Sequence, residues 1–248
     1  MSGLLQIENL LIGYDKALTN HINLTANAGD IICVVGRNGT GKSTLLNTLA
    51  GVIKPIEGNC YIKGKEINKI KHTERSSVIS YVTSRLDYLS NFKIFDLVAI
   101  GRSPYTNIFD KRSEKDIEII HQYLKDFEIS YLKDKPLYSV SDGERQRAMI
   151  CRAFVQETPV ILLDEPTAFL DYYSKNKLLQ KLSELAIIDK KCIVFSSHDL
   201  EIAFKFVSKI WLFDKNNVGQ FELEDLKSGN ILETAMSFKF NQTSSHEF

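Results

Sequence analysis

The residues from Gly36 to Ser43 have the types and spacing of a loop that could hold phosphate groups. They read Gly-Arg-Asn-Gly-Thr-Gly-Lys-Ser and fit the pattern G-x-x-x-x-G-K-[ST]. Glycines let the backbone curl so that successive N–H groups point inward and form a site for anions. Lys42 would reach the outer phosphates of a nucleoside triphosphate, and the Ser43 hydroxyl would ligate Mg²⁺. The predicted nucleotide contacts in this segment and directly after it are Gly36, Asn38, Gly39, Thr40, Gly41, Lys42, Ser43 and Thr44.

Two carboxylates and a histidine follow apolar runs further along the chain. Asp164 and Glu165 come directly after the run 160–163, and His198 follows the run 192–195. Carboxylates at the end of a buried strand need cationic partners, so Asp164 would hold Mg²⁺ through water and Glu165 would polarise a nucleophilic water. A lone histidine after a strand is most often structural, but His198 should reach the sheet edge where ligands bind. The candidate catalytic residues are Glu165, His198 and Lys42, and the candidate metal ligands are Ser43 and Asp164.

A phosphate loop needs a strand before it and a helix after it, and the flanking residues have both patterns. The run 31–35 is continuously apolar, and residues 44–50 suit a helix that stops at Gly51. This context argues against the alternative that the octet is a glycine turn formed by chance. Further strands are predicted in short segments between residues 4 and 35, and at residues 59–63, 78–82, 160–163, 192–195 and 209–214.

Helical character extends from about residue 94 to about residue 140. The clearest helix is 113–127, which opens with Ser113 and Asp116 in a capping arrangement and carries one apolar stripe. Ser141 and Glu144 form the capping box S-x-x-E, which predicts a helix running to about Glu157. Taken alone, this box indicates only that a helix starts. Beside a phosphate loop, the positive end of that helix becomes a second candidate anion site.

The amino-acid composition indicates which classes of protein the chain can belong to. The chain has 248 residues, 44% hydrophobic and 25% charged, with 31 basic and 31 acidic side chains. This balance gives no global basic excess, so we do not expect a nucleic-acid partner. The four cysteines form no C-x-x-C pair, and three of them sit in apolar runs, which favours buried reduced thiols. Without a signal-peptide pattern or an apolar run near 20 residues, we expect a soluble, cytoplasmic protein.

Taken in order, these motifs resemble those of the ATP-binding subunit of ABC transporters over about residues 4–215. The 36–43 loop is similar to the family's Walker A motif, and residues 141–144 resemble its signature. Asp164 and Glu165 resemble the Walker B aspartate and the catalytic glutamate, and His198 resembles the switch histidine. Tyr14 resembles the aromatic that stacks on adenine, although by default it is a surface tyrosine. The resemblance adds Tyr14, Ser141, Gly143, Glu144 and the D-loop Asp171 to the predicted nucleotide contacts.

The resemblance implies an α/β fold: a P-loop NTPase (ABC ATPase) core with an antiparallel β subdomain and a helical subdomain. Residues 1–248 would form a single ABC ATPase domain. Within it, residues 1–82 and 158–225 would form the nucleotide-binding core with the β subdomain. Residues 85–157 would form the helical subdomain with the signature, and residues 226–248 a C-terminal tail.

The resemblance also implies a function, which is ATP hydrolysis coupled to transport. Mg²⁺ and ATP would bind between two copies that meet head to tail, and transmembrane permease subunits would dock on residues 84–105. A solute-binding protein would act indirectly, and the chain would lie on the inner face of the cell membrane. The run Ala99-Ile100-Gly101-Arg102-Ser103-Pro104-Tyr105 resembles the G-R-x-P segment of importers for iron–siderophore complexes, haem and cobalamin.

Two departures from the family pattern leave alternatives open. Ser84 holds the place of the Q-loop glutamine, and Asp142 replaces a signature glycine. Asp142 would favour the helix start by roughly 0.3–1 kcal/mol, but its charge would repel a γ-phosphate. An alternative is therefore an ATP-responsive switch with weak or no hydrolysis. A third candidate, a soluble ABC ATPase acting on DNA or the ribosome, usually has coiled-coil insertions or tandem cassettes that this sequence lacks.

Overall fold

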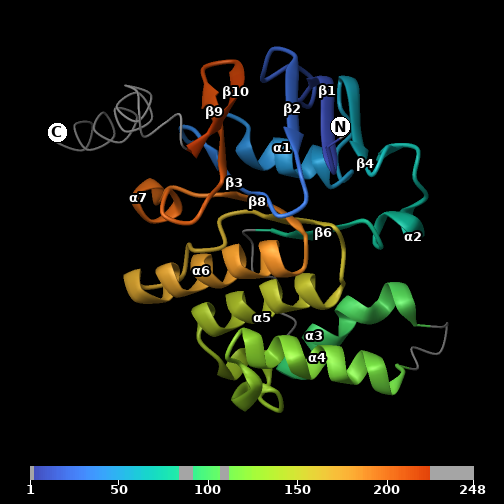
Figure 1. Ribbon diagram of the computed structural model, residues 1–248, viewed down its shortest axis with the longest axis vertical. Helices are drawn as coiled ribbons and strands as arrows, with labels where there is room; N and C mark the ends of the chain where they lie inside the picture. Colours follow the sequence, from blue (N-terminus) through green and yellow to red (C-terminus); the bar gives the residue numbers. More distant parts are fainter. Residues whose placement is uncertain (1–2, 84–91, 107–111, 224–248) are drawn as a thin grey trace.

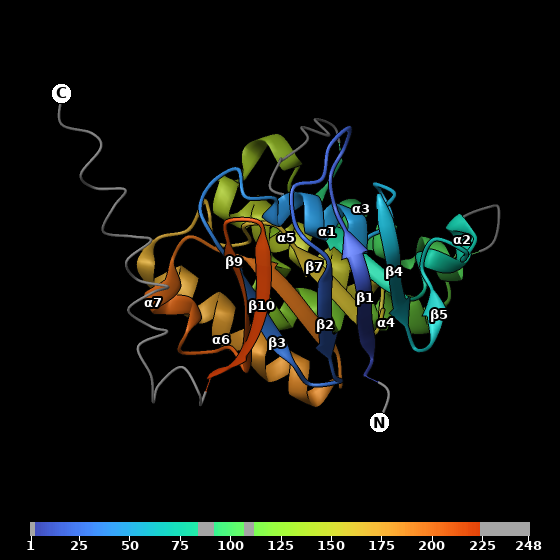
Figure 2. The same ribbon diagram turned by 90° about the horizontal axis from the view of Figure 1, so that it is seen from above.

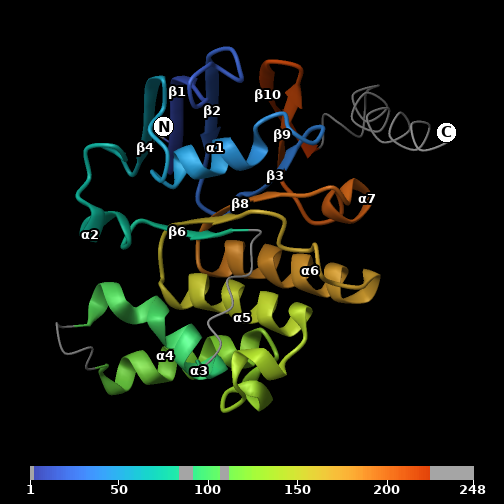
Figure 3. The ribbon, with the colours of Figure 1, turned by 180° about the vertical axis from the view of Figure 1, so that it is seen from behind.

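The computed structural model describes residues 3–83, 92–106 and 112–223. Two β-sheets and a set of helices are stacked in layers (Figure 1). Helix α1 (Lys42–Leu49) lies between the two sheets (Figures 1 and 3). Helices α5 (Asp142–Val155) and α6 (Tyr172–Ile188) cover the opposite face of the larger sheet, and α3 (Ile94–Ala99) and α4 (Glu114–Asp126) lie beyond α5 (Figures 1 and 3). Among the described residues, no helix combines the length and apolar character that crossing a membrane requires.

The larger sheet has the strand order β10-β9-β3-β8-β7-β6. Its neighbouring strands are parallel except for β10, which pairs antiparallel with β9. The strands are β3 Ile31–Val35, β6 Ile79–Val82, β7 Val160–Leu163, β8 Cys192–Ser196, β9 Lys209–Asp214 and β10 Asn217–Glu222. Because β3, β8 and β7 are adjacent, the residues that follow these strands meet at one edge of the sheet.

The smaller sheet is antiparallel, with the order β2-β1-β4-β5. Its strands are β1 Leu5–Leu11, β2 Ile22–Ala26, β4 Glu57–Ile62 and β5 Lys65–Glu66. Seen from above, β10 runs beside β2 (Figure 2), and Thr25 donates its N–H to the Gln220 side chain there. The two sheets therefore touch along this side of the molecule.

Helices connect and cover the sheets. The α-helices are α1 Lys42–Leu49, α2 His72–Arg75, α3 Ile94–Ala99, α4 Glu114–Asp126, α5 Asp142–Val155, α6 Tyr172–Ile188 and α7 Leu200–Ala203. The 3₁₀ helices are η1 Ile100–Tyr105, η2 Ser130–Leu132 and η3 Leu137–Ser139. The predicted capping boxes of α4 and α5 are both formed. Helix α5 stops at Val155, slightly before the predicted end, and Glu157 then adopts a positive φ of 51°.

The larger sheet separates two hydrophobic cores. Ile31, Cys33 and Val35 of β3 belong to the core shared with α3, α4, α5 and α6. Ile32 and Val34 face the other core, which α1 and the smaller sheet complete. A strand buried on both faces has no polar position to fill, so its sequence is a continuous apolar run. The four cysteines are free and buried, as the sequence predicted.

Candidate functional site

The turn from β3 into α1 requires glycine. A Cβ atom at Gly36 would lie 2.7 Å from the Cβ of Phe213 and 3.0 Å from the Oγ1 of Thr40. Gly41, the N-cap of α1, has a φ of 108°, which lies in the left-handed region that favours glycine. The Thr40 hydroxyl donates to the carbonyl oxygen of Arg37 and closes the loop. The sequence therefore folds here as strand, tight loop and helix.

Lys42 is folded back into this loop and is only 7% exposed. Its Nζ donates to the carbonyl oxygens of Gly36, at 2.8 Å, and Arg37, at 3.1 Å. Burial lowers the pKa of Lys42, while the nearby carboxylates of Glu165 and Asp164 act in the opposite direction. The loop thus places a cation next to two acidic side chains.

Asp164 and Glu165 follow β7, and Ser196 at the end of β8 contacts both. The Ser196 Oγ donates to Oδ1 of Asp164 at 2.7 Å and accepts the backbone N–H of Glu165 at 2.8 Å. Asp164 is 3% exposed, and its N–H donates to the Val82 carbonyl. Glu165 has a φ of 53°, an uncommon conformation for a residue other than glycine. Sequence patterns did not single out Ser196, whose only signal was its position after an apolar run.

His198 reaches the Glu165 side chain. Its Nε2 lies 2.9 Å from Oε1 of Glu165. The hydrogen bond with Glu165 raises the pKa of His198, although partial burial acts against this. The structure thus brings together the predicted catalytic residues Lys42, Glu165 and His198 from three different loops at one sheet edge.

A pocket of about 440 Å³ lies at this edge. It is lined by Leu18, Asn38, Gly39, Gly41, Lys42, Ser43, Thr44, Glu165 and His198. Tyr14 lies in the turn after β1, with 67% of its surface exposed. Gly36 and Thr40 shape the loop from behind through the contacts described above. The pocket therefore combines residues of the glycine loop, a buried cation and a carboxylate.

The other predicted contacts lie elsewhere, around a second pocket of about 370 Å³. This pocket is lined by Ser141, Asp142, Gly143, Glu144, Arg147, Phe169, Leu170, Asp171 and Ser174. Ser141 and Glu144 cap α5 reciprocally, and the backbone N–H of Ser141 holds the pKa of Glu144 below its usual range. Asp171 caps α6 by accepting the N–H of Ser174. Among the residues that the structure describes, the two pockets share no lining residue, so one chain does not join the two predicted groups there.

Asp142 has a counter-charge in its own helix. Nη1 of Arg145 donates to Oδ1 of Asp142 at 2.7 Å, and the guanidinium also donates to the Leu137 carbonyl. Arg145 is buried, whereas the Asp142 side chain is about half-exposed. The expected repulsion between Asp142 and a γ-phosphate is therefore reduced by this neighbouring cation.

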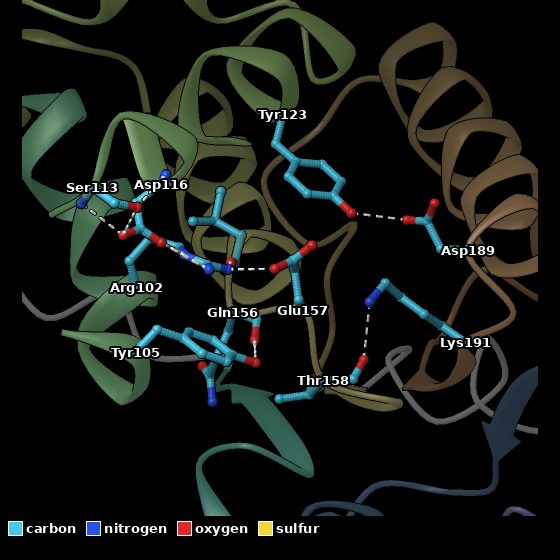
Figure 4. A network of polar contacts seen from close by, with 11 residues as sticks. Arg102, Tyr105, Ser113, Asp116, Tyr123, Gln156, Glu157, Thr158, Asp189 and Lys191 are labelled. Atoms are coloured by element: carbon cyan, nitrogen blue, oxygen red, sulfur yellow. Dashed lines mark hydrogen bonds and ion pairs between the residues drawn. The ribbon is translucent and has the colours of Figure 1, made fainter. Parts of the chain in front are cut away.

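Arg102 in the predicted docking segment is buried, with 4% of its surface exposed. Its guanidinium bonds Asp116 at 2.8 Å, Glu157 at 2.7 Å and the Val155 carbonyl at 2.8 Å (Figure 4). Arg102 therefore ties η1 to α4 and to the end of α5 and presents no charge to a partner, whereas Tyr105 is 44% exposed. Ser84 and the rest of 84–91 lie outside the described residues, as does the predicted 226–248 tail.

The residues present fit a nucleotide with its metal ion. The loop offers backbone N–H groups at a helix N-terminus and the Lys42 ammonium, which together suit phosphates. Ser43 supplies a hydroxyl and Asp164 a carboxylate, and oxygen ligands of this kind suit Mg²⁺ when phosphates and water complete its shell. One of the two Asp164 oxygens, Oδ1, already accepts a hydrogen bond from Ser196.

Comparisons with known proteins agree with this geometry. The family described as "ABC transporter" matches residues 19–168. An uncharacterised ABC transporter ATP-binding protein of Methanocaldococcus jannaschii is 38% identical, over 95% of this chain and 86% of that protein. The iron(3+)-hydroxamate import ATP-binding protein of Bacillus subtilis is 30% identical, over 92% of this chain and 83% of that protein.

A solved structure extends the agreement to the fold. A metal-chelate type ABC transporter in an inward-facing conformation superposes with a TM-score of 0.78 and 31% identity, covering 90% of this chain and 84% of that chain. Sequence motifs, fold and relatives lead to the same assignment. The chain belongs to the ABC transporter family, as an ATP-binding subunit.

Proposed function

We propose that this subunit binds MgATP and hydrolyses it to ADP and phosphate. The observation that carries the proposal is the convergence of Lys42, Glu165 and His198 on one pocket beside the phosphate loop. Phosphoryl transfer to water needs positioned reactants and neutralised charge more than covalent help from the protein. Lys42 and His198 would neutralise charge, and Glu165 would position the water.

Each residue would have a defined role. Lys42 would exchange its carbonyl contacts for phosphate oxygens, and Ser43 with Asp164 would hold Mg²⁺. When bound, Mg²⁺ would neutralise charge on the phosphates. Glu165 would accept a hydrogen bond from the attacking water, and His198 would fix the Glu165 carboxylate and approach the γ-phosphate. Tyr14 would stack on the adenine.

The separation of the two pockets supports a dimer of this chain. Ser141, Gly143, Glu144 and Asp171 line the second pocket and would contact nucleotide held by the phosphate loop of another copy. The N-terminus of α5 there offers N–H groups and a positive dipole end to phosphate. A head-to-tail pair would be two-fold symmetric and would close two such composite sites.

We further propose that hydrolysis drives uptake of a chelated metal, of the iron–siderophore, haem or cobalamin type, through membrane permease subunits. The names of the hydroxamate importer and of the metal-chelate transporter support this, together with the Gly101-Arg102 resemblance. The subunit would then lie at the inner face of the membrane, and a solute-binding protein would act indirectly. Residues 85–157 would move as a helical subdomain against the core formed by 1–82 and 158–225.

The alternative is an ATP-responsive switch that hydrolyses little. One argument for the switch was that the charge of Asp142 would repel a γ-phosphate. The ion pair between Asp142 and Arg145 weakens this argument. Ser84, the other reason, lies outside the described residues. The presence of Glu165 and His198 in hydrogen-bond contact favours hydrolysis.

Steady-state phosphate release by the purified protein tests the proposal. We expect Mg²⁺-dependent release by the natural chain and a fall of about 100-fold or more in Glu165→Gln, because general-base catalysis contributes typically 10²–10⁴-fold. ATP binding should survive this change, since Lys42 and the loop are intact. Equal hydrolysis by both proteins would remove Glu165 from its role, and absence of hydrolysis in the natural chain with its membrane partners would favour the switch.

A further inference from the structure

Ser196 contacts both Asp164, the proposed Mg²⁺ ligand, and Glu165, the proposed catalytic residue. It is the last residue of β8 and is fully buried. It lies opposite Val34 in the register between β8 and β3, and the next strand on its other side is β7. Ser196 is therefore at the end of the strand that lies between the one leading into the phosphate loop and the one leading into Asp164 and Glu165.

Both hydrogen-bonding functions of this hydroxyl are directed at those two residues. As a donor it contacts Oδ1 of Asp164 at 2.7 Å, and as an acceptor it takes the N–H of Glu165 at 2.8 Å. A hydroxyl bonded to an ionised carboxylate makes one of the stronger side-chain hydrogen bonds. One atom thus restrains the orientation of the Asp164 carboxylate and the backbone of the next residue.

Glu165 is the residue that most needs this restraint. Its φ of 53° is a conformation that persists only where the surrounding structure enforces it. Two residues after Ser196, His198 holds the other end of Glu165 through its carboxylate at 2.9 Å. The end of β8 therefore holds Glu165 at two points, the backbone through Ser196 and the side chain through His198.

We propose that Ser196 is a positioning residue for the reaction: through Asp164 it sets the Mg²⁺ ligand, and through the Glu165 backbone it sets the carboxylate that orients water. This inference rests on the proposed function. Residues that hydrogen-bond a metal ligand from behind orient that ligand, and their loss typically costs 10–100-fold in metal affinity or activity. Ser196 should therefore affect steps that need Mg²⁺ or Glu165 and leave the contacts between phosphates and the loop unchanged.

The test compares Ser196→Ala, Ser196→Cys and Ser196→Thr with the natural chain. Alanine removes the hydroxyl, cysteine keeps a side chain of similar shape with much weaker hydrogen bonds, and threonine restores the hydroxyl. Ser80→Ala is a matched control, because Ser80 is also a buried serine of the larger sheet and accepts a hydrogen bond from Thr158, away from the pocket. The readouts are the Kd for ATP in EDTA, the Mg²⁺ concentration that half-saturates nucleotide binding, kcat and KM, and the thermal midpoint.

For Ser196→Ala and Ser196→Cys we expect an ATP Kd in EDTA within about twofold of the natural value, and at least about a tenfold rise in the half-saturating Mg²⁺ concentration. The value of kcat should fall by about tenfold or more, with a smaller change in KM. Ser196→Thr should recover most of both losses, and Ser80→Ala should change neither. If Ser196→Ala does not fold, Ser196→Cys carries the same comparison.

The inference would be overturned if folded Ser196→Ala or Ser196→Cys kept its Mg²⁺ dependence and kcat within twofold of the natural values. It would also be overturned if folded Ser196→Thr did not recover Mg²⁺ dependence and kcat, or if Ser80→Ala lost as much of both as Ser196→Ala. These results differ from failure of the proposed function itself. In that case the natural chain would show no Mg²⁺-dependent nucleotide binding or hydrolysis, whatever the variants do.

Discussion

The contact between His198 and Glu165 is a titratable pair, and its protonation can be measured. The hydrogen bond raises the pKa of His198 above its ordinary value of 6.5, because the protonated ring is the better donor to a carboxylate. We expect NMR titration of the histidine ring to give a pKa above 6.5, and a lower value in Glu165→Gln, which keeps the shape but removes the charge. A pKa that does not change in Glu165→Gln would contradict the role assigned to this contact.

A raised pKa also predicts how this pair contributes to stability. The contribution is fully present below the unfolded-state pKa and is lost as the pH rises through the folded-state pKa. Because the His198 side chain is 56% exposed, we expect the contribution of this pair to the free energy of unfolding to stay below about 1 kcal/mol. In urea unfolding, the difference in unfolding free energy between the natural chain and His198→Gln should shrink as the pH is raised from about 6 to about 9. A difference that grows over this interval would show that the sign is wrong.

At the scale of single residues, sequence motifs were informative where chemistry requires one residue type at a fixed spacing. Lys42 and Ser43 were predicted in this way, as were the two acidic residues after β7, and the structure places Lys42, Ser43 and Glu165 around one pocket. Ser196 was not, because a hydroxyl that bonds residues 31 and 32 positions away leaves no local pattern. Its role depends on the register of β7 and β8, which the sequence did not determine.

At the scale of elements, the Arg102 network joins η1, α4 and the end of α5 (Figure 4). We expect Arg102→Ala to lower the free energy of unfolding by about 3–5 kcal/mol, because it leaves the buried Asp116 carboxylate without its cation. Arg102→Lys should recover only part of this loss, since a single ammonium cannot reproduce the forked contacts of a guanidinium. Chemical unfolding measures both variants.

Glu157→Gln is the matched control for this network. It removes the charge of the half-exposed partner of Arg102 and leaves Asp116 in place. Exposed ion pairs contribute little, so we expect a loss of about 1 kcal/mol or less. A loss in Arg102→Ala no larger than that in Glu157→Gln would mean that the buried pair does not stabilise the junction.

The elements themselves were mostly predictable from sequence. Capping residues fixed the starts of α4 and α5, and continuous apolar runs located β3, β7, β8 and β9, because burial on both faces allows no polar position. Strand β10 was missed, since Asn217 to Glu222 carries few apolar residues and is only partly buried. The burial of Arg102 was missed as well, because its partner Glu157 lies 55 positions away in the chain.

At the scale of the whole molecule, the phosphate-loop pocket and the signature pocket have no described lining residue in common, which predicts that neither is sufficient alone. Lys42→Ala damages the first pocket, and Ser141→Arg places a bulky side chain in the second. We expect each variant alone to lose hydrolysis. Ser141→Arg should still bind ATP within a few-fold of the natural Kd, because its loop is intact, whereas Lys42→Ala should not.

Mixing these two variants provides the sharpest test of a head-to-tail dimer. In a mixed pair, the phosphate loop of the Ser141→Arg chain faces the intact signature of the Lys42→Ala chain, so one composite site is complete and the other carries both defects. Hydrolysis should therefore reappear on mixing and vary with the ratio of the two chains, with its maximum near equal amounts. The same mixture carrying Glu165→Gln on the Ser141→Arg chain should stay inactive, because the complete site would lack its carboxylate. If hydrolysis needed only one chain, Ser141→Arg would retain activity alone and mixing would only dilute it.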